Sequence, residues 1–124
     1  MKVLIADDQS RVRYALRVLL EQHFGFEIAG EALDACELLH QVETLRPGLL
    51  LLDWDLPGLK PESHMPELQR LQPQLKVIVV TSKSELRKAA LDAGADAFVS
   101  KGGPPEILLT ALELCSNNCA SDRS

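Results

Sequence analysis

Side chains able to do chemistry follow four of the five short apolar runs in this chain. They are Asp7 and Asp8 after the first run, Asp53 after the third, Thr81 after the fourth and Lys101 after the fifth. Three carboxylates brought together would repel one another, which raises their pKa values unless a cation balances them. Such oxygen ligands suit Mg²⁺, which takes one or two carboxylates with water and phosphate oxygens. A hydroxyl and a lysine beside them suit a phosphoryl group, so these residue types indicate phosphoryl transfer to or from an aspartate.

These side chains meet only if the apolar runs are strands of one sheet. The runs are strand-length and cover residues 3–6, 26–29, 49–52, 77–80 and 97–99. Between them, apolar residues recur at the spacing of a buried helix face, as in Val12, Leu16 and Leu19. Strands that alternate with helices form a parallel sheet whose carboxyl ends share one edge. The sequence therefore predicts an α/β fold: a single doubly wound (βα)5 flavodoxin-like domain, with a five-stranded parallel sheet and helices on both faces.

The third run consists of four leucines, 49–52, and alone it is ambiguous between strand and helix. Pro47 before it and Pro57-Gly58 after it are helix breakers, which favours a strand. A strand buried on both faces of the sheet is apolar at every position. We therefore expect a central strand that ends at Asp53.

Two segments have the residue spacing of a helix capping box. They are Asp34 with Glu37, and Ser82 with Glu85. In each, the first side chain would accept a hydrogen bond from the backbone N–H three residues on. Both pairs therefore predict the start of a helix.

The segment before the fourth strand is the least regular. Its prolines at 61, 66 and 73 limit any helix to about 66–71, with a loop over 59–65. Gly94, in contrast, stands where a glycine ends a helix, directly before the fifth strand.

Bulk properties bound the function further. The 124 residues suit one domain, predicted over 1–116, with 117–124 as a polar tail or the start of a linker. A net charge of −5 argues against direct nucleic-acid or membrane-surface binding by this chain, and no run is long enough to span a membrane. Its three cysteines form no CxxC pair, which is typical of reduced thiols in a cytoplasmic protein. The three histidines show no metal-ligand spacing.

Four motifs together resemble the receiver domain of bacterial two-component response regulators. They are LIADDQ at 4–9, LLLLDWDLPG at 49–58, VIVVTS at 77–82 and GADAFVSK at 94–101. Each is weak alone, but all four stand in order at predicted strand ends. The resemblance covers nearly the whole chain.

The resemblance implies a role for each acid. Asp53 would be the phosphoacceptor that attacks the phosphohistidine of a sensor histidine kinase. Asp8 would bind Mg²⁺ directly, and Asp7 would assist directly or through water. Asp55, two residues beyond the acceptor, would give the metal its backbone carbonyl.

The resemblance also implies roles for residues of the fourth and fifth strand ends. Thr81 and Lys101 would bind phosphoryl oxygens. Phe98 would be the aromatic switch residue that turns inward when Thr81 moves, or else an ordinary core aromatic. Lys83, with the side chain of Asp55, would tune hydrolysis of the phosphoryl group.

One departure concerns the residue after Lys101. Family members commonly have proline there, often with a cis bond, whereas this chain has Gly102. A cis peptide is not expected, because a non-proline cis bond costs about 2.5–4 kcal/mol.

The segments DDQSRVRYALRVLL and KGGPPEILLTAL resemble receivers of the LuxR class. That class carries a C-terminal helix-turn-helix DNA-binding output domain, and phosphorylation of the receiver would switch this output and could produce a homodimer. The chain would then be an excised receiver. The alternative is a stand-alone or degenerate receiver that acts through protein contacts.

A remote alternative is a haloacid-dehalogenase-like phosphatase, because LLLLDWD resembles its DxD motif after a strand. Such enzymes usually begin with that motif and need a longer chain. A receiver, by contrast, would not be a turnover enzyme, although it would catalyse its own phosphorylation and dephosphorylation.

Overall fold

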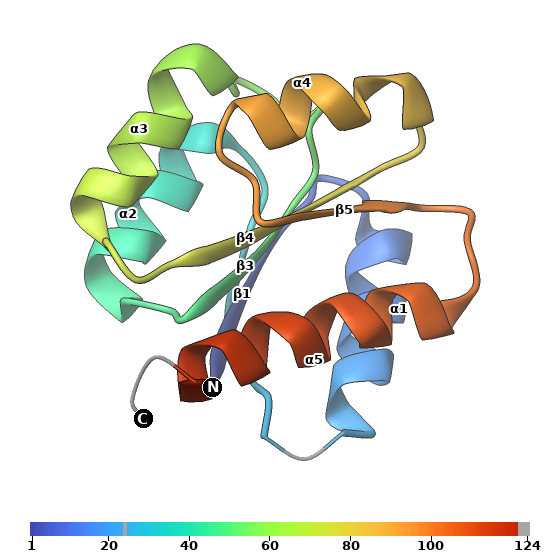
Figure 1. The fold of residues 1–124 in the computed structure, drawn as a ribbon. Coiled ribbons are helices and arrows are strands. Elements are labelled where there is room, and N and C mark those ends of the chain that lie inside the picture. Colours follow the sequence, from blue (N-terminus) through green and yellow to red (C-terminus); the bar gives the residue numbers. More distant parts are fainter. Residues whose placement is uncertain (24, 122–124) are drawn as a thin grey trace.

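The structure is a computed structural model that describes residues 1–23 and 25–121, with side chains described up to residue 116. In these residues five strands alternate with five helices (Figure 1). The strands are β1 (Lys2–Ala6), β2 (Glu27–Ala32), β3 (Leu49–Leu52), β4 (Lys76–Thr81) and β5 (Ala97–Ser100). The helices are α1 (Ser10–Glu21), α2 (Ala35–Leu45), α3 (Pro61–Leu71), α4 (Arg87–Asp92) and α5 (Pro105–Ser121), and a 3-10 turn, η1 (Ser84–Leu86), precedes α4.

The sheet is parallel throughout, with strand order β2-β1-β3-β4-β5. The order reverses between β1 and β3, and in such sheets the functional crevice lies outside the strand ends at this point. Ala6 pairs with Leu52 at the ends of these two strands. The residues that follow, Asp7 and Asp53, therefore emerge side by side.

Helices cover both faces of the sheet, as predicted. Figure 1 shows α1 and α5 on one side and α2, α3 and α4 on the other. The four leucines of β3 alternate between the two layers. Leu50 and Leu52 pack in the core under α2 and α3, and Leu49 and Leu51 pack in the core under α1 and α5. All four are at most 1% exposed, which explains the run of leucines, since each buried leucine contributes about 1.5–3 kcal/mol.

The predicted third helix is wrong in extent. A loop was expected over 59–65 and a helix over 66–71, but α3 begins at Pro61 and has Pro66 inside it. Pro61 occupies the first turn, where a helix needs no N–H donor. Pro66 is exposed, and its missing N–H costs the helix one backbone hydrogen bond. Met65 and Leu68 are buried in the core, and their packing holds the helix together.

The two predicted capping boxes have different outcomes. Asp34 caps α2 by accepting a hydrogen bond from the N–H of Glu37 at 2.8 Å. Ser82 caps nothing: η1 begins after Lys83 without a side-chain cap. The N-cap position falls on Lys83, one residue later than the box requires. The N–H of Lys83 donates to the hydroxyl of Thr81 at 3.3 Å.

Gly94 ends α4 as predicted. It has a φ of +112°, its N–H donates to the carbonyl of Leu91, and the next N–H, of Ala95, donates to that of Ala90. Two other boundaries moved: β2 extends to Ala32, beyond the predicted end at 29, and α5 continues to Ser121, past the predicted domain limit at 116. Residues 122–124 of the predicted polar tail lie outside the described residues. The linker role of 117–124 stays a prediction.

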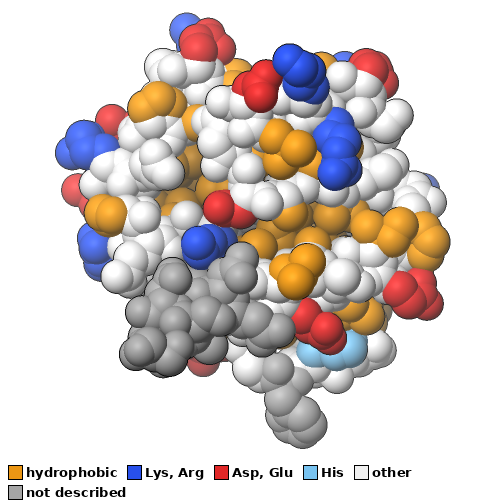
Figure 2. Space-filling view, in the orientation of Figure 1, with side chains coloured by type: hydrophobic (Ala, Val, Ile, Leu, Met, Phe, Trp, Pro, Cys, Tyr) orange, Lys and Arg blue, Asp and Glu red, His pale blue; other side chains and the backbone are white. Residues whose placement is uncertain are grey.

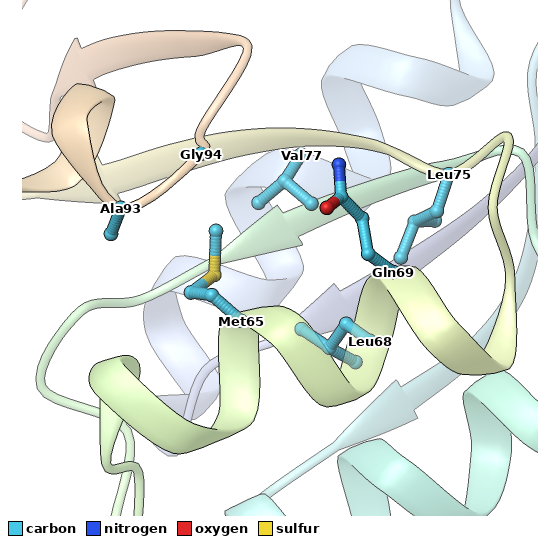
Figure 3. A pocket seen from close by; sticks show the side chains of 7 residues that line it. All are labelled: Met65, Leu68, Gln69, Leu75, Val77, Ala93 and Gly94. Carbon is cyan, nitrogen blue, oxygen red and sulfur yellow. The ribbon is translucent and has the colours of Figure 1, made fainter.

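A small cavity of about 10 Å³ lies between α3, the start of β4 and the end of α4 (Figure 3). It is lined by Met65, Leu68, Gln69, Leu75, Val77, Ala93 and Gly94. None of these side chains is ionisable, and the volume holds about one water molecule. The cavity is therefore a packing gap rather than a candidate site. None of the described helices is both long and apolar enough to cross a membrane.

The two capping boxes yield a stability prediction. Asp34→Ala should lower the free energy of unfolding by about 1 kcal/mol, because it removes the cap of α2. Ser82→Ala, which has the same sequence spacing but no capping bond, should change it by less than about 0.5 kcal/mol. Urea unfolding of both variants measures this difference. Equal losses would contradict the assignment of the caps.

Candidate functional site

Three carboxylates gather at the carboxyl ends of β1 and β3. Asp7 and Asp53 are 1% and 4% exposed, whereas Asp8 is exposed. The backbone fixes the two buried acids, since Asp7 N–H donates to Ala32 and Asp53 N–H donates to Ala6, at 3.0 and 2.9 Å. One carboxylate oxygen from each acid lies within 4.8 Å of the others. Hard oxygen donors so arranged fit Mg²⁺, as the sequence predicted.

Lys101 reaches this cluster from the end of β5. Its Nζ lies 2.9 Å from Asp7 Oδ2 and 3.3 Å from Asp53 Oδ2, and it donates to Gln9 Oε1 at 3.1 Å. Its backbone N–H donates to the carbonyl of Thr81 at 2.9 Å, which ties the loop after β5 to the end of β4. The Lys101–Gly102 peptide is trans.

Burial sets the charge state of this site. Burial raises the pKa of Asp53 above its ordinary value, and the charge of Asp7 adds to this, while the N–H of Asp55 and the ammonium of Lys101 oppose it. For Lys101 burial alone would lower the pKa, but the hydrogen bond to Asp7 and the charges of both acids outweigh it, so the pKa is raised. Lys101 therefore stays protonated and positively charged. Its single charge is smaller than the negative charge of the three carboxylates when they are ionised.

The turn after β3 orients the carboxylate of Asp53. Its Oδ1 accepts the N–H of Asp55 at 3.0 Å, which leaves Oδ2 toward Lys101. The carbonyl of Asp53 accepts the N–H of Leu56, whose side chain is buried, and Gly58 closes the turn with a φ of +79°. A buried side chain and a left-handed glycine thus hold Asp53 in one orientation.

Asp55 and Lys83 form an ion pair at the exposed mouth of the site. Lys83 Nζ lies 3.4 Å from Asp55 Oδ1, and both side chains are about half exposed. The pair spans the loops that follow β3 and β4, beside Asp53 and Thr81. The predicted hydrolysis-tuning residues are therefore brought together.

Thr81 and Phe98 lie on the same face of the sheet. Thr81 pairs with Ser100 on the neighbouring strand, and Phe98 is two residues before Ser100. Residues two apart on a strand point to the same face, so Phe98 and Thr81 share one face of the sheet. Thr81 is fully buried, and Phe98 is partly buried against the core of the α2–α4 side. The geometry required of the predicted switch pair is present, and its movement stays a prediction.

Sequence reasoning missed three residues beside Asp7, which are Arg13, Arg17 and Glu31. Arg13 donates to the backbone carbonyl of Asp7 at 2.9 Å, and its Nε pairs with Glu31 Oε1 at 2.9 Å. Arg17 pairs with the same glutamate. The available signal was the four-residue spacing of Gln9, Arg13 and Arg17 on one helix face, next to an acid at the end of a strand.

The fold and site define a doubly wound α/β protein whose acidic site, contacted by one lysine, lies where the strand order of the sheet reverses. The sequence profile of the response regulator receiver domain matches residues 3–113. The chain therefore belongs to the response regulator receiver family, and not to the haloacid-dehalogenase-like phosphatases.

Individual relatives agree with this assignment. The transcriptional activator protein ExaE of Pseudomonas putida is 35% identical over 114 residues, covering 90% of this chain and 53% of its own. A protein-glutamate methylesterase/protein-glutamine glutaminase of Myxococcus xanthus is 38% identical over 104 residues, covering 82% of this chain and 30% of its own. The crystal structure of a two-component response regulator of the LuxR family from Aurantimonas sp. SI85-9A1 has a TM-score of 0.83 at 25% identity, covering 94% of this chain and 85% of its own. The chain thus spans about half or less of the length of the curated relatives.

The raised pKa of Asp53 yields a prediction for the metal-free protein. Because the folded state disfavours the charged carboxylate, its contribution to stability falls as pH rises from 3.8 through the raised folded pKa. Asp53→Asn escapes this loss, so it should be more stable than the wild type at neutral pH, and the difference should vanish as pH falls toward 3.8. Urea unfolding with a chelator present measures it. The exposed Asp92→Asn is the matched control, and an Asp53→Asn variant less stable than wild type at neutral pH would contradict the prediction.

Proposed function

We propose that this receiver accepts a phosphoryl group on Asp53 from the phosphohistidine of a sensor histidine kinase, in a Mg²⁺-dependent reaction. The observation that carries the proposal is the buried Asp53 carboxylate, held within a three-acid cluster and contacted by Lys101. Acids in this state attract a divalent cation, and the lysine stands ready for a phosphoryl oxygen.

The acids and the turn after β3 would hold the metal. Asp7, Asp8 and Asp53 would supply carboxylate oxygens, and Asp55 its backbone carbonyl. Bound Mg²⁺ would neutralise charge on the acids and on the phosphoryl oxygens. The proposed ligands stand on segments that the backbone bonds of β1 and β3 already fix.

Transfer then needs only positioning by this chain. An Asp53 oxygen attacks the phosphorus, the phosphorus–nitrogen bond of the phosphohistidine breaks, and its electron pair returns to the imidazole. Lys101 and the hydroxyl of Thr81 hydrogen-bond two phosphoryl oxygens. In hydrolysis, water attacks the phosphorus and releases inorganic phosphate, which restores the Asp53 carboxylate. The receiver is thus a phosphoacceptor and not a turnover enzyme.

The phosphoryl group would add about −1.5 to −2 charges at the site and bias two loop arrangements. Thr81 would move toward the phosphate, and Phe98 would turn into the space on the same face of the sheet. The surface of α4, β5 and α5 would change as a result. This surface would pass the signal to an output.

The output and location rest on the relatives. One is named as a transcriptional activator and one matched structure is of a LuxR-family regulator, which supports a DNA-binding output domain in a cytoplasmic regulator. The relative named as a methylesterase shows that receivers of similar sequence occur with other outputs. This chain itself would bind no nucleic acid, given its net charge of −5.

The proposed homodimer has an apolar surface available on α1 and α5. A groove of about 250 Å³ lies between them, lined by α1 residues such as Val12 and Leu19 and by Pro104 and Leu108. Figure 2 shows hydrophobic side chains gathered around a hollow over β5 and α5. Both helices also expose large apolar side chains, which are Tyr14, Val18, Ile107 and Leu114. Arg11 on α1 and the glutamates Glu106 and Glu113 on α5 are exposed, and these opposite charges favour packing of α1 on the α5 of a second copy.

Labelling by acetyl phosphate tests the proposed function. Incubation of the wild type with Mg²⁺ and acetyl phosphate should add the mass of one phosphoryl group, read by intact mass spectrometry. Asp53→Ala should add none, and Asp92→Ala, a distant acid, should behave as wild type. An unlabelled wild type, or an undiminished label on Asp53→Ala, would refute the proposal.

The ion pair between Asp55 and Lys83 at the mouth of the site yields a prediction about the rate of dephosphorylation. Lys83→Ala or Asp55→Ala should shorten the lifetime of the phosphoryl group, because either change opens the mouth of the site to water. The decay of the labelled mass after removal of acetyl phosphate measures the lifetime. Lys88→Ala breaks the exposed Lys88–Asp92 pair and is the matched control. Unchanged decay in both mouth variants would show that the pair does not govern hydrolysis.

A further inference from the structure

Gln9 occupies an unusual position between the acids and α1. It is the N-cap residue of α1, yet its side chain makes no capping hydrogen bond. Its backbone N–H donates to Asp7 Oδ1 at 2.9 Å, and its side-chain Oε1 accepts from Lys101 Nζ at 3.1 Å. An exposed glutamine at the start of a helix thus contacts the lysine at the far end of the sheet, 92 positions along the chain.

The partners of Lys101 are of two kinds. A lysine ammonium has three N–H donors, and Lys101 Nζ has three acceptor side chains within 3.3 Å, those of Asp7, Asp53 and Gln9. The two acids are also the candidate metal ligands. Only Gln9 is neutral and outside that cluster.

Lys101 and a divalent cation therefore compete for the same oxygens. Asp7 Oδ1 accepts the N–H of Gln9, and Asp7 Oδ2 contacts the ammonium of Lys101. Asp53 Oδ1 accepts the N–H of Asp55, and Asp53 Oδ2 contacts the ammonium of Lys101. Since every carboxylate oxygen of the two buried acids already accepts one contact, a cation that takes Oδ2 of either acid weakens the hold of that acid on the lysine.

We propose that Gln9 is a positioning residue that retains Lys101 at the site when the carboxylates turn to the metal. The inference rests on the Mg²⁺ dependence of the proposed function. In the metal-free state Gln9 is one of three partners of the ammonium, but in the metal-loaded state it carries a larger share of the contacts. Gln9 thus lowers the free energy that Mg²⁺ must supply to displace the lysine from the acids.

Substitution of Gln9 and substitution of Lys101 should therefore change the affinity for Mg²⁺ in opposite directions. Gln9→Met keeps the length of the side chain and the backbone N–H, but removes the acceptor. It should weaken Mg²⁺ binding by roughly three- to tenfold, as expected for the net contribution of one typical hydrogen bond. Lys101→Ala removes the competing cation and should tighten binding.

A double-mutant cycle on Mg²⁺ affinity tests the inference. Dissociation constants would be measured by calorimetry and by the fluorescence of Trp54, the single tryptophan, which is next to Asp53 and partly buried. In the Lys101→Ala background, Gln9→Met should have no effect, because the lysine it would retain is gone. Gln22→Met, at the other end of α1, is the matched control and should bind Mg²⁺ as the wild type does.

The outcomes separate the inference from the function on which it rests. Equal affinities of wild type and Gln9→Met overturn the inference alone, and so does an equal loss in the Lys101→Ala background, which would indicate an effect on the helix start. A wild type that binds no Mg²⁺ overturns the metal-dependent function and the inference with it. Should circular dichroism show Gln9→Met unfolded, Gln9→Asn replaces it, because its amide is one methylene too short to reach Lys101. Wild-type affinity in a folded Gln9→Asn would then overturn the inference.

Discussion

The interaction on which the site depends is the contact of one ammonium with two buried carboxylates. Asp7 and Asp53 are almost fully buried, and burying a lone carboxylate is costly unless it is paired and hydrogen-bonded. Lys101 meets both, but its single charge leaves the cluster net negative. Removing the lysine would leave both buried carboxylates without their positive partner, which typically costs about 3–5 kcal/mol. The remaining negative charge favours the binding of a second cation.

The topology of the sheet explains how three distant segments meet. β1 and β3 are neighbours because the strand order reverses there, which puts Asp7 beside Asp53. β4 separates β3 from β5, so Lys101 must reach across the end of β4. Its backbone N–H bonds to the carbonyl of Thr81, which anchors that crossing. The same bond makes the position of the lysine sensitive to any movement of Thr81.

Sequence alone predicted what topology dictates and missed what side-chain packing decides. The acids, Thr81 and Lys101 were predictable because residues that follow parallel strands share one edge of a sheet. The early start of α3 was not, because two buried residues on its inner face outweigh an exposed Pro66. Nor was the failed cap at Ser82, since only the structure shows that the N-cap position falls on Lys83. Contacts between side chains of distant elements, such as that of Gln9 with Lys101, cannot be predicted from sequence spacing, because the two residues lie 92 positions apart.

The contacts of Thr81 link the site to the surface that would carry a signal. Its hydroxyl accepts the N–H of Lys83, the residue directly before η1, and its carbonyl accepts the N–H of Lys101. A hydroxyl recruited by a phosphoryl oxygen would turn away from Lys83, so the start of η1 and the mouth pair with Asp55 would lose an anchor together. Phe98 lies on the same face of the sheet and is only partly buried. Thr81 would thus couple phosphorylation of Asp53 to α4 and β5, because its hydroxyl contacts the residue before η1 and its carbonyl contacts the residue after β5.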